Sequence, residues 1–286
     1  MHIDSHQHFW RYDERRDSWI TPQMSVLKRD FLPEDLLPEL RANYMDGSVA
    51  VQADQSEQET MFLLDLAGRF SGIKGVVGWV DLCSPELPQR LEYFSRFERL
   101  CGFRHVVQSE PDDRYMLRKD FLAGIGSLQR FKFTYDILIY PQQLPAAIEL
   151  AGKFPEQRFV IDHLAKPRIR SGEVSPWAQQ ITTIASNPNV YCKLSGLITE
   201  ADWQSWCESD FKPYLDVVFD AFGPDRLMFG SDWPVCLLAG TYGRVKQLVA
   251  GYIRNLPIEK QEGIFGLNAT HFYGLKTSHH EPATAR

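Results

Sequence analysis

The sequence is poor in cysteine and contains no long apolar run. Its five cysteines lie far apart in 286 residues and form no CxxC pair, which favours reduced thiols over a disulfide framework or a zinc knuckle. No apolar segment approaches the ~20 residues that a membrane helix needs. The first residues, 1–4, also lack the basic and apolar regions of a signal peptide. We therefore expect a cytoplasmic protein that does not enter a membrane.

An excess of positive charge is also missing. The formal net charge is -6, which argues against nucleic acid or an anionic membrane as the main partner. With 44% hydrophobic and 13% aromatic residues, the chain can bury a large core. Its length is great for one ordinary domain but usual for a single α/β barrel. We expect a small-molecule partner, and the sequence leaves the oligomeric state open.

Strand-like and helix-like segments alternate along almost the whole chain. Helical patterns begin at residues suited to helix starts, such as Pro33 and the capping-box pair Ser56 and Glu59. The predicted strands are 2–8, 48–53, 73–81, 102–108, 131–136, 158–163, 190–196 and 226–232. Eight strands, seven intervening helical patterns and further helices over 242–273 fit a single (β/α)8 TIM barrel better than an open sheet. We expect one domain over 1–275 and a polar C-terminal tail over 276–286.

Acid–base residues recur where these strands end. His6 and His8 alternate on the first strand, so they share one face, with α-carbons ~6.6 Å apart. His163 and Asp232 end two later strands. Because the carboxyl ends of barrel strands meet, we expect these four side chains to converge in one pocket, where imidazoles can bind a cation or polarise a carbonyl. The other groups expected there are Trp79, Arg104 or His105, Asp136 and Ser195.

Six motifs resemble the amidohydrolase superfamily, and within it the branch of sugar lactonases typified by L-fucono-lactonase and L-rhamnono-lactonase. They span nearly the whole chain: DSHQHFW at 4–10, VVGWVDL at 76–82, GFRH at 102–105, DHLAKP at 162–167, CKLSGL at 192–197 and FGSDWPV at 229–235. The resemblance implies an α/β barrel of the amidohydrolase type. It also implies an enzyme of carbohydrate metabolism, a lactone (carboxylic ester) hydrolase that opens a small sugar (aldono-) lactone.

The same resemblance bears on metal content. Superfamily members with two metals have a bridging lysine or glutamate and two histidines from successive later strands. Here only one of these later strands supplies a histidine, His163, and the neighbouring strand ends carry Asp136 and Ser195, which predicts that there is no binuclear centre. His6, His8 and His163 can still hold one divalent ion, with zinc the best match. No organic cofactor is expected.

The mechanism we expect is attack of water on the lactone carbonyl, with Asp232 as general base. His6, His8 and His163, or one divalent ion held by them, stabilise the oxyanion. If Asp232 also ligates the ion, the tetrahedral shell is closed, so a role as base is favoured. The metal is not required if fixed donors stabilise the oxyanion. The structural alternative for Asp232 is an N-cap of the following helix.

Substrate-binding residues are expected around this centre. Arg104 can bind hydroxyls or a carboxylate through its forked donors, or pair with a local acid. His105 alternates with Arg104, so only one of the two should face the lumen. Lys166 lies in the loop just after His163, where it can bind a carboxylate. Asp162, adjacent to His163, should point to the opposite face and serve the structure.

Tryptophans offer a second kind of contact with the substrate. Trp19, Trp79 and Trp233 can stack on a sugar ring, although aromatic residues are mostly core.

Two other functions compete with lactone hydrolysis. One alternative is a metal-dependent decarboxylase of an aromatic or muconate-type acid, which needs a cluster of cations. Another is a non-catalytic small-molecule-binding barrel, which has no need of a base opposite an oxyanion site. The sequence leaves open which sugar lactone and which ring size the site accepts.

Overall fold

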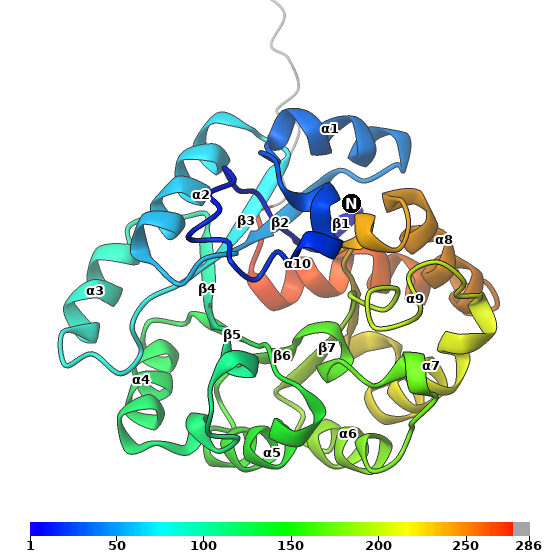
Figure 1. Ribbon diagram of the computed structural model, residues 1–286. Helices are drawn as coiled ribbons and strands as arrows, with labels where there is room; N and C mark the ends of the chain where they lie inside the picture. The colour runs from blue at the N-terminus through cyan, green and yellow to red at the C-terminus, as the bar shows by residue number, and fades with distance from the viewer. Residues whose placement is uncertain (277–286) are drawn as a thin grey trace, which may run out of the picture.

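Eight parallel strands follow one another around a barrel in the order of the sequence (Figure 1). The structure is a computed structural model and describes residues 1–276. The strands are β1 (Ile3–Gln7), β2 (Gly47–Val51), β3 (Ile73–Gly78), β4 (Leu100–His105), β5 (Thr134–Ile137), β6 (Phe159–Ile161), β7 (Val190–Leu194) and β8 (Leu227–Phe229). The predicted (β/α)8 barrel and its eight strands are confirmed.

Helices connect the strands and pack around the outside of the barrel. The main ones are α1 (Pro33–Ala42), α2 (Glu57–Arg69), α3 (Leu87–Phe94), α4 (Lys119–Arg130), α5 (Leu144–Lys153), α6 (Trp177–Ala185), α7 (Glu208–Phe222) and α8 (Tyr242–Ile253). As predicted, Pro33 begins α1, and the Ser56 hydroxyl accepts a hydrogen bond from the Glu59 N–H (3.1 Å). The Glu59 carboxylate does not complete the capping box, because it accepts the N–H of Ala53 instead (3.2 Å).

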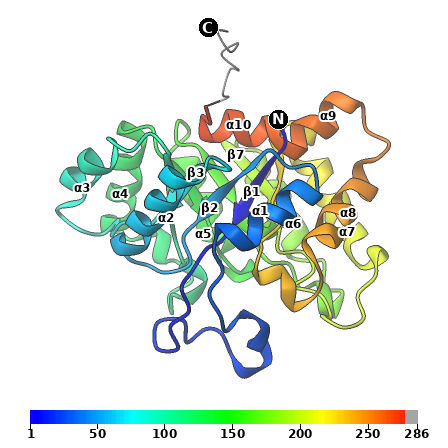
Figure 2. The same ribbon diagram turned by 90° about the horizontal axis from the view of Figure 1, so that it is seen from above.

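One end of the barrel is closed by an additional helix. After α9 (Ile258–Glu262), α10 (Asn268–Tyr273) crosses the end from which the strands start (Figure 2). Its Phe272 and Tyr273 pack in one buried cluster with Val49, Val77 and Met228 from three strands. Each large apolar side chain buried this way stabilises the fold by ~1.5–3 kcal/mol. Among the described residues, this end of the barrel is therefore filled by packed side chains.

A long loop stands off the opposite end of the barrel, between β1 and α1 (Figure 2). It contains a short helical segment, η1 (Pro22–Leu27). Its base is closed by backbone hydrogen bonds between Trp10 and Phe31 (3.0 and 2.9 Å), and the Trp10 indole N–H donates to the carbonyl of Arg29 (2.9 Å). The loop thus covers part of the barrel mouth, as its length predicts.

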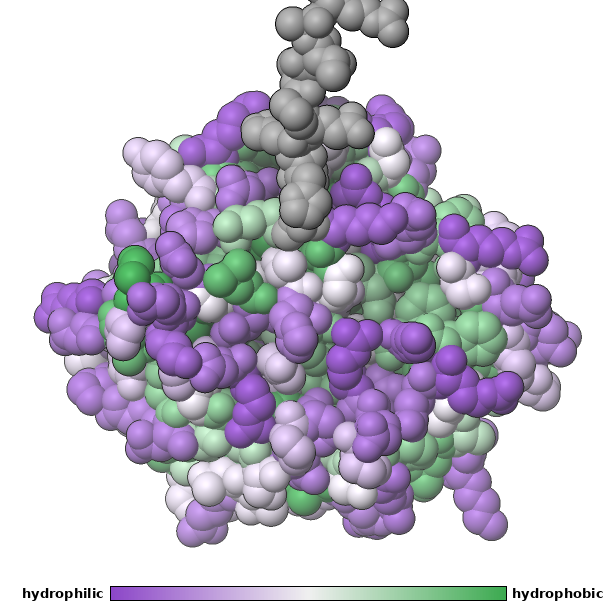
Figure 3. All heavy atoms as spheres, turned by 180° about the vertical axis from the view of Figure 1, so that it is seen from behind, coloured by the Kyte–Doolittle hydropathy of each residue, from purple (hydrophilic) through white to green (hydrophobic). Residues whose placement is uncertain are grey.

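The predicted C-terminal tail lies outside the described residues except for Lys276, whose ammonium contacts the carboxylate of Glu98 (2.7 Å). Seen from behind, polar and charged side chains are intermixed with smaller apolar areas (Figure 3). Within residues 1–276, no helix combines the length and the apolar character needed to cross a membrane.

Candidate active site

The barrel closes between β8 and β1, and the candidate active site lies on this seam. The backbone N–H of Asp232 donates to the carbonyl of His6 (2.8 Å). The buried carboxylate of Asp4 accepts the N–H (2.9 Å) and the hydroxyl (2.6 Å) of Ser231, although the two residues are 227 positions apart. Because the two strand ends are bonded to each other, side chains from the start and the end of the chain meet here.

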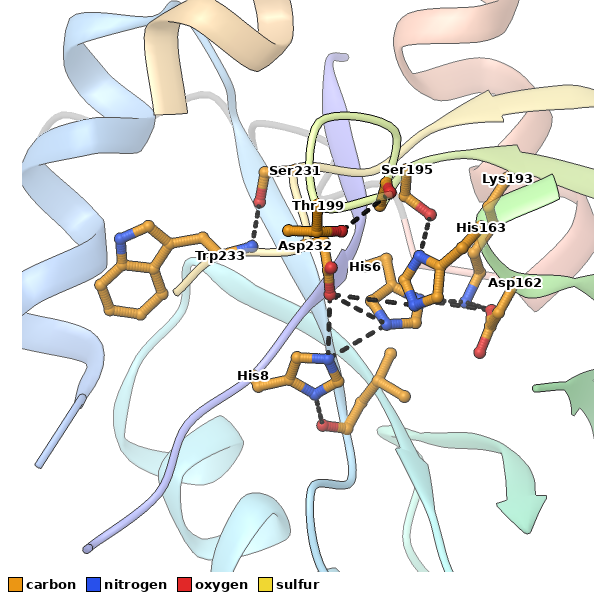
Figure 4. A network of polar contacts seen from close by, with 12 residues as sticks. His6, His8, Asp162, His163, Lys193, Ser195, Thr199, Ser231, Asp232 and Trp233 are labelled. Atoms are coloured by element: carbon orange, nitrogen blue, oxygen red, sulfur yellow. Dashed lines mark hydrogen bonds and ion pairs between the residues drawn. The ribbon is translucent and has the colours of Figure 1, made fainter. Parts of the chain in front are cut away.

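His6, His8 and Asp232 form a tight buried cluster at the seam (Figure 4). The Nε2 atoms of the two histidines are 3.1 Å apart. Oδ1 of Asp232 lies 3.8 Å from Nε2 of His6 and 3.4 Å from Nε2 of His8. Nδ1 of His8 donates to the carbonyl of Val51 (2.7 Å). This bond leaves the lone pair of neutral His8 on Nε2, directed at the cluster.

His163 reaches the cluster through an unusual backbone turn. After β6, the four residues 163–166 have φ angles of 53°, 55°, 57° and 50°, and Asp232 has φ 57°. A left-handed conformation costs an L-residue ~1–2 kcal/mol, and such strain is concentrated at functional sites. The turn places Nε2 of His163 3.9 Å from Oδ1 of Asp232, while its Nδ1 lies 2.9 Å from the Ser195 hydroxyl.

Asp162 does not point away from the site, so that prediction is wrong. Its Oδ1 lies 3.3 Å from Nδ1 of His6, and its Oδ2 accepts a hydrogen bond from Nη1 of Arg104 (3.0 Å). The prediction assumed strand alternation through His163, but β6 ends at Ile161 and the left-handed turn begins immediately afterwards. Both Asp162 and His163 therefore face the barrel interior.

A buried lysine lies beneath His6, and sequence reasoning missed it. Nζ of Lys193 lies 2.5 Å from Oδ2 of Asp136, 2.9 Å from Oδ1 of Asp162 and 3.0 Å from Nδ1 of His6. The Tyr273 hydroxyl also donates to Asp136 (2.7 Å). The signal was available, because a lysine in the middle of an otherwise apolar strand must be paired if it is buried.

This network gives His6 two alternative roles. If Nδ1 accepts a hydrogen bond from Lys193, the proton of neutral His6 lies on Nε2, which can then donate to a substrate oxygen. If Nδ1 instead donates to Asp162, Nε2 carries the lone pair that a metal ion needs. The contacts of Nδ1 with both residues make each arrangement available.

Burial and neighbouring charge set the protonation of the cluster. Burial lowers the pKa of His163 to about 4, against the attraction of Asp232. Burial, reinforced by Lys193, lowers the pKa of His6 well below its usual value. Burial alone would raise the pKa of Asp232, but the adjacent histidines outweigh it and hold that pKa below its usual range. His6 and His163 are thus neutral and Asp232 is ionised near neutral pH.

The residues fit one divalent ion. His6, His8 and Asp232 offer two imidazole nitrogens and a carboxylate oxygen that lie within 4.8 Å of one another, and this donor set suits zinc at ligand distances of ~2.0–2.2 Å. A second group, formed by His6, Asp162 and His163, also meets that spacing. There, however, both oxygens of Asp162 already contact the cations Lys193 and Arg104. Among residues 1–276, the geometry therefore favours a single ion.

Above the cluster lies a cavity of about 660 Å³, a size typical of small-molecule sites. Three of the predicted substrate-binding residues line it: Arg104, Lys166 and Trp19. His105 faces outward, where its ring stacks on Tyr115 (centroids 5.1 Å apart). Arg104, and not His105, is therefore the residue of this pair that faces the cavity.

Two predicted tryptophans lie outside the cavity. The indole N–H of Trp79 donates to Nδ1 of His105 (3.3 Å), on the outer side of β4. Trp233 is 3% exposed and packs edge-on against Phe9 and Phe31 (centroids 6.2 and 5.3 Å away). Trp233 is therefore corrected to a core role, because it packs against neighbouring aromatic rings. Trp79 is half-buried and bonded to His105 outside the cavity, so stacking of Trp79 on a sugar ring in the cavity is also corrected.

Gly196 should prove essential for the position of His163. It has φ 61°, and a β-carbon there would lie 2.6 Å from Cγ and Nδ1 of the His163 ring. We expect Gly196→Ala to lower kcat ~10²-fold or more, because a displacement of about 1 Å at a reacting group has effects of this size. Steady-state kinetics on a folded variant, verified by circular dichroism, would measure it. A kcat equal to that of the wild type would show that activity does not depend on the close contact between Gly196 and the His163 ring.

The barrel carries a histidine pair at the end of β1 and an aspartate after β8, and these residues could hold one metal ion. The profile of the amidohydrolase family matches residues 3–275, and the chain belongs to this family. It is 40% identical to an L-fucono-1,5-lactonase of Burkholderia multivorans, over 100% of this chain and 99% of the relative. An L-fucono-1,5-lactonase of Burkholderia ambifaria is 38% identical, over 96% and 95%.

A solved structure extends the likeness to the metal. The crystal structure of an amidohydrolase from Burkholderia multivorans with bound zinc has a TM-score of 0.93 to this chain and is 41% identical. The match covers 96% of this chain and 100% of that one. Together with the cluster of His6, His8 and Asp232, it is consistent with one divalent metal ion here.

Proposed function

We propose that this protein hydrolyses a small neutral sugar lactone, such as L-fucono- or L-rhamnono-lactone, to the sugar acid. The observation that carries the proposal is the position of Asp232, whose Oδ1 lies within 4 Å of Nε2 of His6, His8 and His163 at the floor of the cavity. This arrangement places a base for water beside donors for an oxyanion. The names and full-length similarity of the two lactonases support the same reaction class.

The charges around the cavity support a neutral substrate. Each arginine or lysine that lines it has a carboxylate within 4 Å, in the pairs Arg16–Asp17, Arg104–Asp162 and Lys166–Glu200. Within the described part of the chain, the charge of each lining arginine or lysine is therefore balanced by a carboxylate of the protein. A decarboxylase of aromatic or muconate-type acids needs an excess of cations for its substrate, so the geometry favours the lactone.

The reaction follows from these positions. Asp232 removes a proton from water as the water oxygen bonds to the lactone carbonyl carbon. The carbonyl oxygen becomes an oxyanion, which His163 stabilises through Nε2–H when Ser195 donates to its Nδ1. His6 can donate in the same way when Lys193 bonds to its Nδ1. The bond to the ring oxygen then breaks, and the proton held by Asp232 passes to that oxygen, giving the hydroxy acid.

A metal, if bound, would be held by His6, His8 and Asp232, where it would supply Lewis-acid polarisation of the lactone carbonyl. We expect elemental analysis to find at most one divalent ion per chain, because cations of the protein occupy the second group. We also expect partial activity after chelation, because His6 and His163 can act as donors without an ion. Two tightly held ions per chain, with activity abolished by their removal, would contradict this.

A panel of aldono-lactones, assayed with a pH indicator with and without chelator, tests the proposal. We expect release of one proton per lactone opened, with 1,5- and 1,4-lactones of six-carbon sugars compared side by side. A wild-type protein that binds these lactones without hydrolysing any would instead support the non-catalytic binding barrel.

A further inference from the structure

Two polar side chains face each other across one wall of the cavity, and neither belongs to the reaction centre. Lys166 ends the left-handed turn after β6, and Glu200 lies in the loop after β7. The Lys166 ammonium is 3.9 Å from Oε1 of Glu200, and the side chains are 18% and 25% exposed. Both line the cavity.

The pair has hydrogen-bonding capacity that the described residues do not use. A separation of 3.9 Å is longer than a direct hydrogen bond, and within residues 1–276 neither charged group has another ion-pair partner. Burial raises the pKa of Glu200 above its ordinary value, against the attraction of Lys166. In this arrangement the partly desolvated carboxylate can accept a hydrogen bond from one ligand hydroxyl, while the ammonium donates to a second ligand oxygen.

Both residues are held at a fixed place relative to the reaction centre. Lys166 is in the same strained turn as His163. The backbone of Glu200 is bonded on both sides, because its N–H donates to Leu197 (3.2 Å) and its carbonyl accepts the N–H of Arg170 (2.9 Å). A substrate whose carbonyl lies at Asp232 would therefore present the same ring positions to this pair each time.

We infer that Glu200 is a specificity-determining residue that accepts a hydrogen bond from a ring hydroxyl of the lactone, while Lys166 donates to a neighbouring oxygen. The inference rests on the proposed function and names its substrate class: lactones with adjacent hydroxyls. A hydroxyl bonded to a carboxylate forms a strong, charge-assisted hydrogen bond. A carboxylate substituent at the same position would be repelled by Glu200. The pair thus selects polyhydroxylated neutral rings over both unsubstituted and acidic ones.

The test is the preference of Glu200→Gln between two lactones. We measure the ratio of kcat/KM for a six-carbon aldono-1,5-lactone to kcat/KM for unsubstituted δ-valerolactone. The amide keeps an acceptor oxygen but loses the charge, which contributes about half of a charge-assisted hydrogen bond, so the ratio should fall ~5- to 10-fold. Lys166→Met should lower it in the same direction. Glu173→Gln is the matched control, because Glu173 is an exposed carboxylate paired with Arg168 and should leave the ratio at its wild-type value.

The ratio separates recognition from stability and from the proposed function. Loss of folded protein lowers both activities by the same factor and leaves the ratio unchanged, so it cannot imitate the expected fall. A ratio within about threefold of wild type in folded, active Glu200→Gln overturns the inference, while wild-type activity on the aldono-lactone leaves the proposed function intact. If the wild type hydrolyses neither lactone, the proposed function itself fails, and the inference with it.

Discussion

Replacing Asp232 with asparagine is expected to lower turnover by ~10²–10⁴, the range typical of losing a general base. The amide keeps the shape of the carboxylate but cannot accept the proton of water. The carboxylate is ionised near neutral pH, as a base for water must be, because the surrounding histidines hold its pKa below the usual range. Folding and lactone binding should be largely unchanged, so the loss should appear in kcat rather than KM.

Two further variants sharpen this result. Asp202→Asn makes the same chemical change in an exposed residue paired with Arg170, and it should leave kcat at the wild-type value. His6→Asn should lower turnover through the oxyanion rather than the proton. If Asp232→Asn opens the best lactone at close to the wild-type rate, general-base catalysis by Asp232 is wrong and a histidine or a metal ion must activate the water.

The sequence was sufficient to predict the barrel, because its eight strands and intervening helices are each encoded by local periodicity. The meeting of His6, His8, His163 and Asp232 also followed, since parallel strands place their carboxyl ends together. Local sequence patterns could not predict the backbone conformation that follows a strand. The left-handed turn over 163–166 reverses the orientation that alternation assigns to Asp162, and no propensity favours such a turn in these residue types.

Contacts between residues that lie far apart in the sequence could not be predicted either. Trp233 could serve substrate or core, and only its contact with Phe31, brought close by the long loop, decides for the core. Lys193 needed partners, but its partners Asp136 and Asp162 come from β5 and from the segment directly after β6. A sequence shows that a buried charge must be neutralised, whereas the fold determines which residues neutralise it. In this protein Lys193 also contacts Nδ1 of His6. The same buried lysine therefore serves both the stability of the barrel and the reaction centre.

Replacing Lys193 with methionine should therefore strongly destabilise the fold. The change leaves Asp136 and Asp162, both fully buried, without the ammonium between them. Breaking a buried ion pair by removing one partner typically costs ~3–5 kcal/mol. Urea denaturation at neutral pH would measure the loss in the free energy of unfolding. Lys212→Met is the control, because Lys212 forms an exposed pair with Asp216 and should cost no more than ~1 kcal/mol.

The pH dependence distinguishes this electrostatic cause from a packing defect. Burial raises the pKa of Asp136 to about 6 even with Lys193 opposing it, so removing the lysine should raise it further. The folded variant then binds more protons than the unfolded chain, and its stability falls as pH rises. The destabilisation should accordingly be larger at about pH 8 than at about pH 5.5, and Asp136→Asn added to Lys193→Met should reverse part of it. A loss that is equal at both pH values and unaffected by Asp136→Asn would show that Lys193 contributes by packing rather than by charge.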